Sequence, residues 1–558
     1  MSSQAAAAPA AIAGAAARLR RVRDTLLGIR TAYVLGALIL IQWAAVLALA
    51  LTVRHNGWLY YAGGDQLWHY SGAYLLAHGH LPLTLVGYGW SVLMLPNAAL
   101  AGPSLLSALP AMLLFNTLVL LPIALLCVYA IAARIAGRLF GYWAASLWIA
   151  IPYLGILFVE PGYHQKYTEL TLPQLVGLTS VPDFPSVVAL LVGAYFCLRA
   201  VDTGSWHSAA AAGLATGYAI AIKPSNSIFL VVPLLVLVVL RWRTMIVFGL
   251  ALTPMLLTLA LWKYRGLGEL AAAPAEPVRI AGATDLLHRI HNPRELNSWG
   301  HLHQVLLGLR EHFWIARVIE WLPLAGLAAL LARSRTGLAL IGSWFVTYLL
   351  AKGTYNPASI EDASFWRILM PAFPAYVLLA AAVVLLVPRA RARPAGGFVP
   401  LAGRKLAVAL AAASMIFVIT PLAVIAAVPP LHDNGAKAVQ LGGILTPVSP
   451  EVAPQAAVDG DTVKLSWRTH AAGSTRVFYR VLRTNSESDT ACGGTPHDAA
   501  DDCRLFPDAL AVTRAGAFVD RPGAGTWTYR IGVSANWLND ERYGDVYVVS
   551  PPVTASVR

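Results

Sequence analysis

The chain has 558 residues, of which 57% are hydrophobic and only 12% are charged, and its mean hydropathy is +0.61. Soluble domains are about 25% charged, so this composition excludes a soluble globular protein and indicates a polytopic membrane protein. The net charge is +13, and 30 of the 41 basic residues precede position 451, in short clusters between apolar runs. That distribution is the positive-inside pattern, and it excludes the continuous basic surface of a nucleic-acid-binding protein.

The predicted transmembrane part covers residues 31–430 and follows a cytoplasmic N-terminal tail, 1–30, which contains the basic segment RLRRVR. A helix needs roughly 20 apolar residues to cross a bilayer, and by that criterion the chain has about eleven spans. They lie near residues 32–53, 106–133, 139–159, 183–201, 208–222, 226–240, 244–263, 314–332, 336–351, 367–388 and 405–428.

Basic residues fall in alternate loops, on the same side as the N-terminus. Cytoplasmic loops carry an excess of Lys and Arg, so we predict that this side is cytoplasmic. An odd number of spans then places the C-terminal end outside the cytoplasm. The excess of Arg over Lys, together with the abundant Ala, favours a GC-rich bacterial source and therefore a bacterial plasma membrane. The clusters are RLRRVR, Arg134 with Arg138, Arg199, Arg241 with Arg243, Arg333 with Arg335, and PRARARP (388–394) with Arg404 and Lys405.

The loops on the opposite, outer face hold most of the His, Asp and Glu of the transmembrane part. Four of them are long, and a short KPSN turn joins two spans. Long loops in compact proteins are usually functional or disordered, so we expect the chemistry on this face. The long outer loops are residues 54–105, 160–182, 264–313 and 352–366.

The first outer loop contains YYAGGDQLWHYSGAYLLAHGHLP, residues 60–82, with Asp65 among aromatic and His side chains. The segment from Asp65 predicts a helix lying in the membrane interface, with Trp68, Tyr74 and Leu75 on one face. Asp65 could simply cap this helix by accepting hydrogen bonds from the first free backbone N–H groups. Gln66 and His69 are candidates to line a cavity beside it.

Other outer-face side chains are additional site candidates. Glu160 and His164 could line the cavity or bind a metal. Asp183 is better explained as the cap of the helix that it begins. Glu361 and Asp362 also qualify, although a local ion pair with Arg367 would explain them equally.

The last part of the chain, 447–558, changes character after a linker at 431–446. Segments such as DTVKLSW and GTWTYRIGVSA alternate polar and apolar residues between turn residues, which predicts a small extracytoplasmic β-sandwich. The SW and WTYRI segments resemble a fibronectin type III module. Cys492 and Cys503 would flank one strand connection, where an oxidising compartment would allow a disulfide.

Three features of the transmembrane part resemble the GT-C superfamily of membrane glycosyltransferases, which use polyprenyl-phosphate sugars. The first is a long outer loop that opens with an acidic residue after the first span. The second is the helix, Lys-Pro turn and helix of GLATGYAIAIKPSNSIFLVVPLL (213–235), and the third is FWRILMPAFPAYVLLAA (365–381). The resemblance covers roughly residues 30–390. The paired acidic residues that are frequent in the family are here Asp65 and Gln66.

The resemblance implies an inverting transfer, with Asp65 as the general base that takes the proton of the acceptor hydroxyl. The acceptor would be a glycan, a lipid or a protein. The leaving phosphate needs positive charge or a divalent metal such as Mg²⁺ or Mn²⁺. Lys223 and Arg367 lie at the outer ends of predicted helices, where they would contact this phosphate or snorkel to the interface.

A membrane transporter or flippase of lipid-linked or cell-envelope substrates, with the sandwich as a binding module, is the alternative. Transporters place ionisable residues near the middle of the membrane and are commonly built from repeats. In this chain the predicted spans are almost free of charge and no internal repeat is visible. The sequence therefore favours an enzyme that acts at the outer surface.

Overall fold

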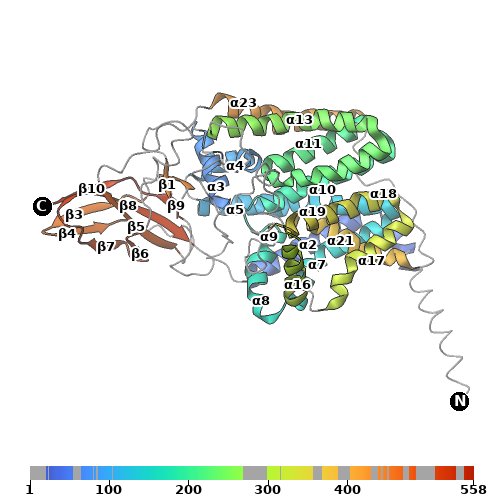
Figure 1. Cartoon of the computed structure of the whole chain (residues 1–558), viewed down its shortest axis with the longest axis horizontal. Helices are drawn as coiled ribbons and strands as arrows, with labels where there is room; N and C mark the ends of the chain where they lie inside the picture. The colour runs from blue at the N-terminus through green and yellow to red at the C-terminus, as the bar shows by residue number, and fades with distance from the viewer. Residues whose placement is uncertain are drawn as a thin grey trace, which may run out of the picture.

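The computed structural model groups the helices in one body and the C-terminal strands in another beside it (Figure 1). The structure describes residues 21–22, 24–53, 65–79, 81–82, 84, 86–102, 105–267, 298–313, 316–355, 367, 369–387, 403–428, 438–441, 444–448, 452–468, 477–485, 509–535 and 546–558.

Helices lie at each of the predicted spans, over the residues that the structure describes. Among the described residues, six helical stretches are long and apolar enough to cross a membrane, including Pro224–Gly266, which covers two predicted spans. The backbone of that stretch leaves helical conformation at Arg241 (φ −154°, ψ 60°). The total of about eleven spans therefore remains a prediction. The main helices are α2 (Thr31–Thr52), α5 (Leu105–Phe115), α6 (Leu121–Ala136), α7 (Arg138–Phe158), α10 (Asp183–Thr203), α11 (Trp206–Ile222), α13 (Val239–Leu267), α17 (Arg317–Arg333), α19 (Ser343–Gly353), α21 (Phe373–Ala382), α22 (Gly403–Ser414) and α23 (Thr420–Ala427).

One end of the helical body gathers basic loops that are far apart in the sequence. Arg138 donates a hydrogen bond to the carbonyl oxygen of Ile29 at 2.9 Å, and Arg134 pairs with Asp202 at 2.8 Å. These contacts agree with the prediction that the basic loops share one side, while the compartment that this side faces stays a prediction. Further contacts at this end join Arg241 to Val201 and Arg333 to Leu385.

The first outer loop folds into α3 (Asp65–Ala77) and α4 (Tyr88–Ala101), which pack against each other. Most residues of α3 are buried inside the protein, including Leu75. Trp68 and Tyr74 of the same helix are half-buried and pack against this core. The position of the helix in the membrane interface stays a prediction.

Glycine allows α4 to approach the end of α11 very closely. A Cβ atom at Gly87 would lie 2.2 Å from the carbonyl oxygen of Ala221, and one at Gly89 would lie 2.8 Å from the backbone nitrogen of Ile222. No side chain fits at these distances. This contact fixes the first outer loop against the segment that leads into Lys223.

The C-terminal strands form two larger antiparallel sheets with a common core. One sheet has the order β3-β4-β7, and the other has the order β10-β8-β5-β6, with β9 also paired to β8. Trp467 and Tyr479 from the two sheets share a buried cluster, with ring centroids 5.8 Å apart. The strands are β3 (Gln455–Asp459), β4 (Thr462–Ser466), β5 (Val477–Asn485), β6 (Ala511–Thr513), β7 (Ala517–Asp520), β8 (Gly525–Ala535), β9 (Val546–Val549) and β10 (Val553–Val557).

A separate hairpin of β1 (Ala438–Leu441) and β2 (Ile444–Pro447) stands where the sequence predicted a linker, and β2 packs against α3. The fibronectin type III likeness of the C-terminal sheets stays a prediction. Cys492 and Cys503 lie outside the described residues, and the described Cys127 and Cys197 are buried free thiols.

Candidate active site

Four charged side chains from four separate segments meet at the end of the helical body opposite the basic loops. Asp65 is the first residue of α3, and Asp183 is the first residue of α10. Lys223 follows α11, and its extended backbone (φ −135°, ψ 100°) is the conformation that the following Pro224 requires. Arg367 stands shortly before α21 (Phe373–Ala382). We call these four residues the ion cluster.

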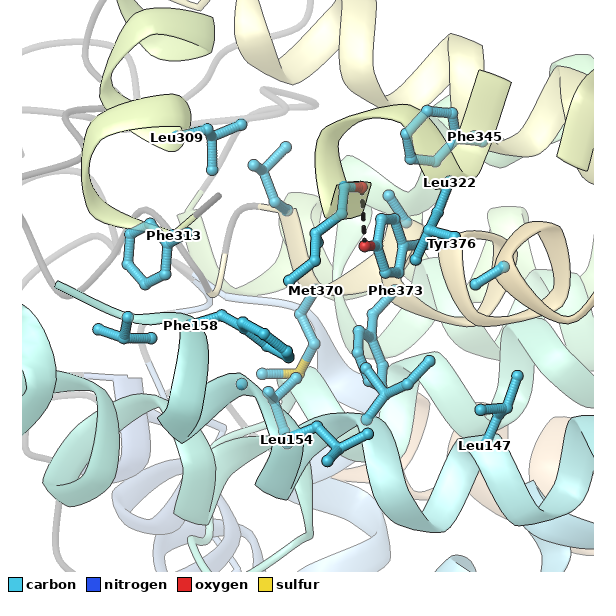
Figure 2. A pocket seen from close by; sticks show the side chains of 18 of the residues that line it. Leu147, Leu154, Phe158, Leu309, Phe313, Leu322, Phe345, Met370, Phe373 and Tyr376 are labelled. Atoms are coloured by element: carbon cyan, nitrogen blue, oxygen red, sulfur yellow. Dashed lines mark hydrogen bonds between the residues drawn. The ribbon is translucent and has the colours of Figure 1, made fainter. Parts of the chain in front are cut away.

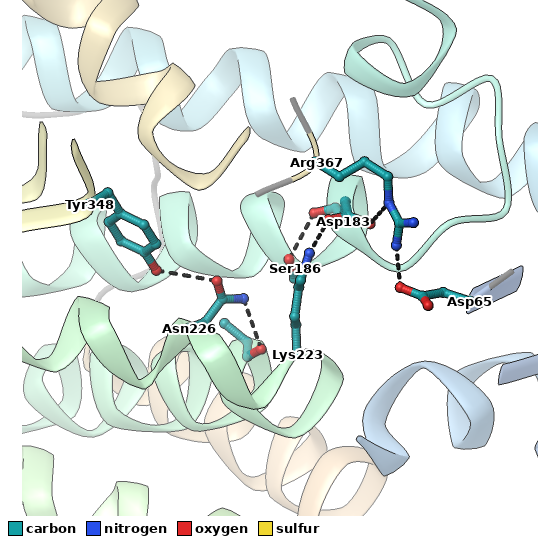
Figure 3. Close-up of polar contacts among 8 residues, drawn as sticks. Asp65, Asp183, Ser186, Lys223, Asn226, Tyr348 and Arg367 are labelled. Atoms are coloured by element: carbon teal, nitrogen blue, oxygen red, sulfur yellow. Dashed lines mark hydrogen bonds and ion pairs between the residues drawn. The ribbon is translucent and has the colours of Figure 1, made fainter. Parts of the chain in front are cut away.

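Arg367 lies between the two carboxylates of the ion cluster (Figure 3). Its Nε donates to Asp183 Oδ2 at 3.1 Å, and its Nη2 donates to Asp65 Oδ2. Lys223 Nζ donates to the other carboxylate oxygen of Asp183. The result is a chain of ion pairs that runs from Lys223 to Asp183 to Arg367 to Asp65 and contains two carboxylates and two cations.

The two carboxylates stand in different surroundings. The side chain of Asp183 is 1% exposed, and the side chain of Asp65 is 45% exposed. The expected capping role of Asp183 is wrong, because Pro182 is the N-cap of α10 without a side-chain hydrogen bond, and the Asp183 carboxylate binds two cations. A buried charge needs such partners.

The neighbouring cations hold the carboxyl group of Asp65 ionised. Desolvation by the surrounding protein raises the pKa of Asp65, but the positive charges of Arg367 and Lys223 outweigh it and lower the pKa from 3.8 to about 2. His69, one turn later on α3, is 2% exposed, and burial lowers its pKa to about 4. At neutral pH Asp65 is therefore charged and His69 is neutral.

Buried polar contacts hold α3 beside the start of α10. Gln66 is fully buried, and its Nε2 donates to Ser180 Oγ at 2.6 Å, while Trp90 Nε1 donates to the carbonyl oxygen of Ser180 at 2.8 Å. Asn116 supports the same loop by donating to the carbonyl oxygen of Thr179 at 2.9 Å. Gln66 thus anchors α3 to the loop before α10, and the His69 ring lies close enough to feel the charges of Asp65 and Asp183. A cavity-lining role for either residue stays a prediction, and sequence reasoning missed the supporting residues.

Buried hydrogen bonds of Asn226 hold the turn that follows Lys223. Asn226 is fully buried, donates to the carbonyl oxygen of Ala219 at 3.2 Å, and accepts a hydrogen bond from Tyr348 OH at 3.2 Å (Figure 3). A polar Asn two positions after the Lys-Pro pair was the available sequence signal for this role.

The remaining candidates do not join the ion cluster in the described structure. Glu160 pairs with His312, with Oε2 and Nδ1 2.7 Å apart, and His164 is exposed on α8 (Pro161–Lys166). Glu361 and Asp362 lie outside the described residues.

An apolar cavity of about 390 Å³ lies between α7, α16 (Trp299–His312), α17, α19 and α21. Its lining is almost wholly apolar, and the Tyr376 hydroxyl in its wall donates to the carbonyl oxygen of Ile319 (Figure 2). Leu369 and Met370 line it two and three positions after Arg367. The chain therefore leads from the ion cluster directly into the wall of the cavity.

The described residues contain no group of three or more His, Cys, Asp or Glu side chains that could hold a metal. The oxygens of Asp183 already bind Lys223 and Arg367, so a metal at this carboxylate would face two fixed positive charges. A divalent metal at the site stays a prediction.

No protein-family model matches the chain, and no curated protein matches its sequence. Among solved structures, it is similar to the Archaeoglobus fulgidus oligosaccharyltransferase in the apo form (16% identity, TM-score 0.38) and to its complex with Zn and sulfate (13%, 0.36). It is also similar to oligosaccharyltransferase AglB of the same organism with an inhibitory peptide and a dolichol-phosphate (13%, 0.39). Each alignment covers 71% of this chain and 54–56% of the other, so the chain aligns with little more than half of their length.

Proposed function

We propose that the chain is a GT-C-type membrane glycosyltransferase, which moves a sugar from a polyprenyl-phosphate donor to an acceptor hydroxyl on the outer face of a bacterial plasma membrane. The observation that carries this proposal is the meeting of Asp65, Lys223 and Arg367 from distant segments, next in sequence to the wall of an apolar cavity. These groups supply a base, two cations for a phosphate and an apolar surface for a lipid.

The proposed reaction is an inverting displacement. The acceptor oxygen forms a bond to C1 of the sugar, and the bond from C1 to the phosphate oxygen breaks. The bonding electron pair leaves with the polyprenyl phosphate, and the acceptor proton passes to Asp65. Lys223 and Arg367 balance the charge that develops on the leaving phosphate.

The apolar cavity is the proposed place for the lipid part of the donor. A polyprenyl chain has no hydrogen-bonding groups, and burying it is favourable by about 25 cal/mol per Å². The lining side chains Leu154, Phe158, Phe313 and Phe373 suit that chemistry (Figure 2). A phosphate at Arg367 would place the first carbons of its lipid near Leu369.

Donor binding and transfer by the purified protein in proteoliposomes test this function. Polyprenyl-phosphate sugars should be consumed, with polyprenyl phosphate released. Lys223→Gln and Arg367→Gln should each weaken donor binding by about tenfold or more, because each loses a charge-assisted contact to phosphate. Arg134→Gln is the matched control: it removes a cation paired with an acid at the opposite end and should bind donor like the parent.

Two outcomes would contradict the proposal. Unchanged donor binding in both Lys223→Gln and Arg367→Gln would mean that these cations only stabilise the fold. Movement of intact lipid-linked sugar across the membrane without cleavage would support the transporter alternative.

The C-terminal sheets are assigned an accessory role in holding a glycan, lipid or protein acceptor.

A further inference from the structure

Asp65 and a donor phosphate need the same group. Arg367 Nη2 donates to Asp65 Oδ2, and this guanidinium is one of the two cations assigned to the phosphate. A carboxylate and a phosphate are both strong acceptors for a guanidinium, so they compete for its N–H groups. The role of Asp65 as a base adds a second conflict, because a carboxylate tied to Arg367 is a poor proton acceptor.

The two acids of the ion cluster differ in how easily Arg367 could leave them. Asp183 is 1% exposed and binds both Lys223 and Arg367, so breaking its pairs would leave a buried charge without compensation. Asp65 is 45% exposed and holds the far end of the Arg367 side chain. Water can therefore reach the Asp65 carboxylate, and its release from Arg367 would not leave a buried charge without compensation.

We propose that Asp65 is an internal competitor of the donor phosphate for Arg367, and that Asp183 is the positioning residue that keeps Arg367 and Lys223 together when Asp65 is displaced. This inference rests on the proposed function. A bound phosphate takes the Nη2 side of Arg367, and Asp65 is released beside the reacting carbon.

Displacement would also make Asp65 a better base. Its pKa is about 2 while Arg367 holds it, and such a carboxylate retains a proton poorly at neutral pH. A phosphate bound to Arg367 would offset the positive charge that lowers the pKa of Asp65, so this pKa would rise. The carboxylate thus becomes competent to accept a proton when the donor is in place, which limits wasteful activation of water.

Binding of farnesyl phosphate, a short prenyl monophosphate, to the full-length protein in detergent tests the competition. Asp65→Asn removes the competing charge and should bind farnesyl phosphate about 3- to 10-fold more tightly than the parent. Asp183→Asn should bind it more weakly, because the two cations lose their common anchor. In an Arg367→Gln background the gain from Asp65→Asn should disappear, since the contested group is absent.

The outcomes separate the inference from the proposed function. If the parent binds farnesyl phosphate but Asp65→Asn binds equally or less tightly with an unchanged melting temperature, the competition is disproved and the donor assignment stands. If the parent shows no saturable binding, the proposed function fails and the inference fails with it. If Asp183→Asn does not fold, the double-mutant cycle of Asp65→Asn and Arg367→Gln, measured by farnesyl phosphate binding, tests the competition alone.

Discussion

Arg367 joins a buried carboxylate and a half-exposed one, and the proposed chemistry depends on that difference. The contact with Asp183 serves the architecture, since removing one partner of a buried ion pair typically costs 3–5 kcal/mol. The contact with Asp65 is the one that we propose a ligand exchanges. One guanidinium can therefore act both as a structural tie and as a binding group.

Replacing Asp65 by Asn should abolish sugar transfer while leaving the protein folded. Asn keeps nearly the same shape and caps a helix about as well as Asp, but it cannot accept the acceptor proton. A general base typically raises the rate about 10²–10⁴-fold, so turnover in proteoliposomes should fall by about 10²-fold or more. A pure capping role predicts the reverse pattern, with normal turnover in Asp65→Asn and loss of stability in Asp65→Ala.

His69 should make the stability of the protein depend on pH. Its folded pKa is about 4 against 6.5 for a free imidazole, so the unfolded chain binds the extra proton between these values. Stability therefore falls as pH falls through this window, by up to about 3 kcal/mol. The melting temperature should drop less on acidification in His69→Asn than in the parent. His78→Asn removes an exposed histidine near the end of the same helix and should keep the parental slope; equal slopes in all three proteins would refute the assignment.

The sequence analysis named all four members of the ion cluster as candidates, and three of them were given chemical roles because each stands at a local signal. Asp65 opens a loop helix, Lys223 precedes a proline, and Arg367 begins an apolar run. Asp183 carries an equally local signal, that of a helix cap, and this signal was misleading. Its true partners are 40 and 184 positions away, and no neighbouring residue reveals them.

At the scale of elements, the long apolar helices were predictable because length and composition suffice to define them. The burial of α3 by protein was not, since the aromatic residues that anchor a helix at a membrane surface also fill protein cores. The β1-β2 hairpin likewise stands in a segment that resembled a linker. Which face a short helix buries depends on neighbours that lie elsewhere in the sequence.

The close packing of α4 on the end of α11 predicts a sensitive glycine. Gly87→Ala would place a methyl group 2.2 Å from the carbonyl oxygen of Ala221, so the helices must separate, at a cost of about 1–3 kcal/mol. The melting temperature should fall, and donor binding should weaken because Lys223 follows this contact. Gly249→Ala, where the new atom meets nothing within 4 Å, is the control. It should leave donor binding near the parent and should not lower the melting temperature, because Ala favours a helix interior over Gly. A Gly87→Ala protein as stable as the control would mean that the contact is loose.

For the whole molecule, the basic loops at one end and the ion cluster at the other predict an orientation in the membrane. The loops rich in Arg should face the cytoplasm, and the C-terminal sheets should lie outside. A reporter that is active only outside the cytoplasm, fused after Arg558, should be active. Cys492 and Cys503 should resist thiol labelling until reduced. An inactive reporter together with freely labelled cysteines would reverse the orientation.

The ion cluster also bears on how the protein is made. Asp65 and Arg367 are separated by 302 positions, and Asp183 and Lys223 are synthesised between them. Until Arg367 leaves the ribosome, two carboxylates have only one cation among the four cluster residues. Charge balance at the site is thus completed late, after most of the helices have entered the membrane. A nascent chain truncated before Arg367 should therefore be a target for membrane quality control, whereas one truncated after α21 should persist longer.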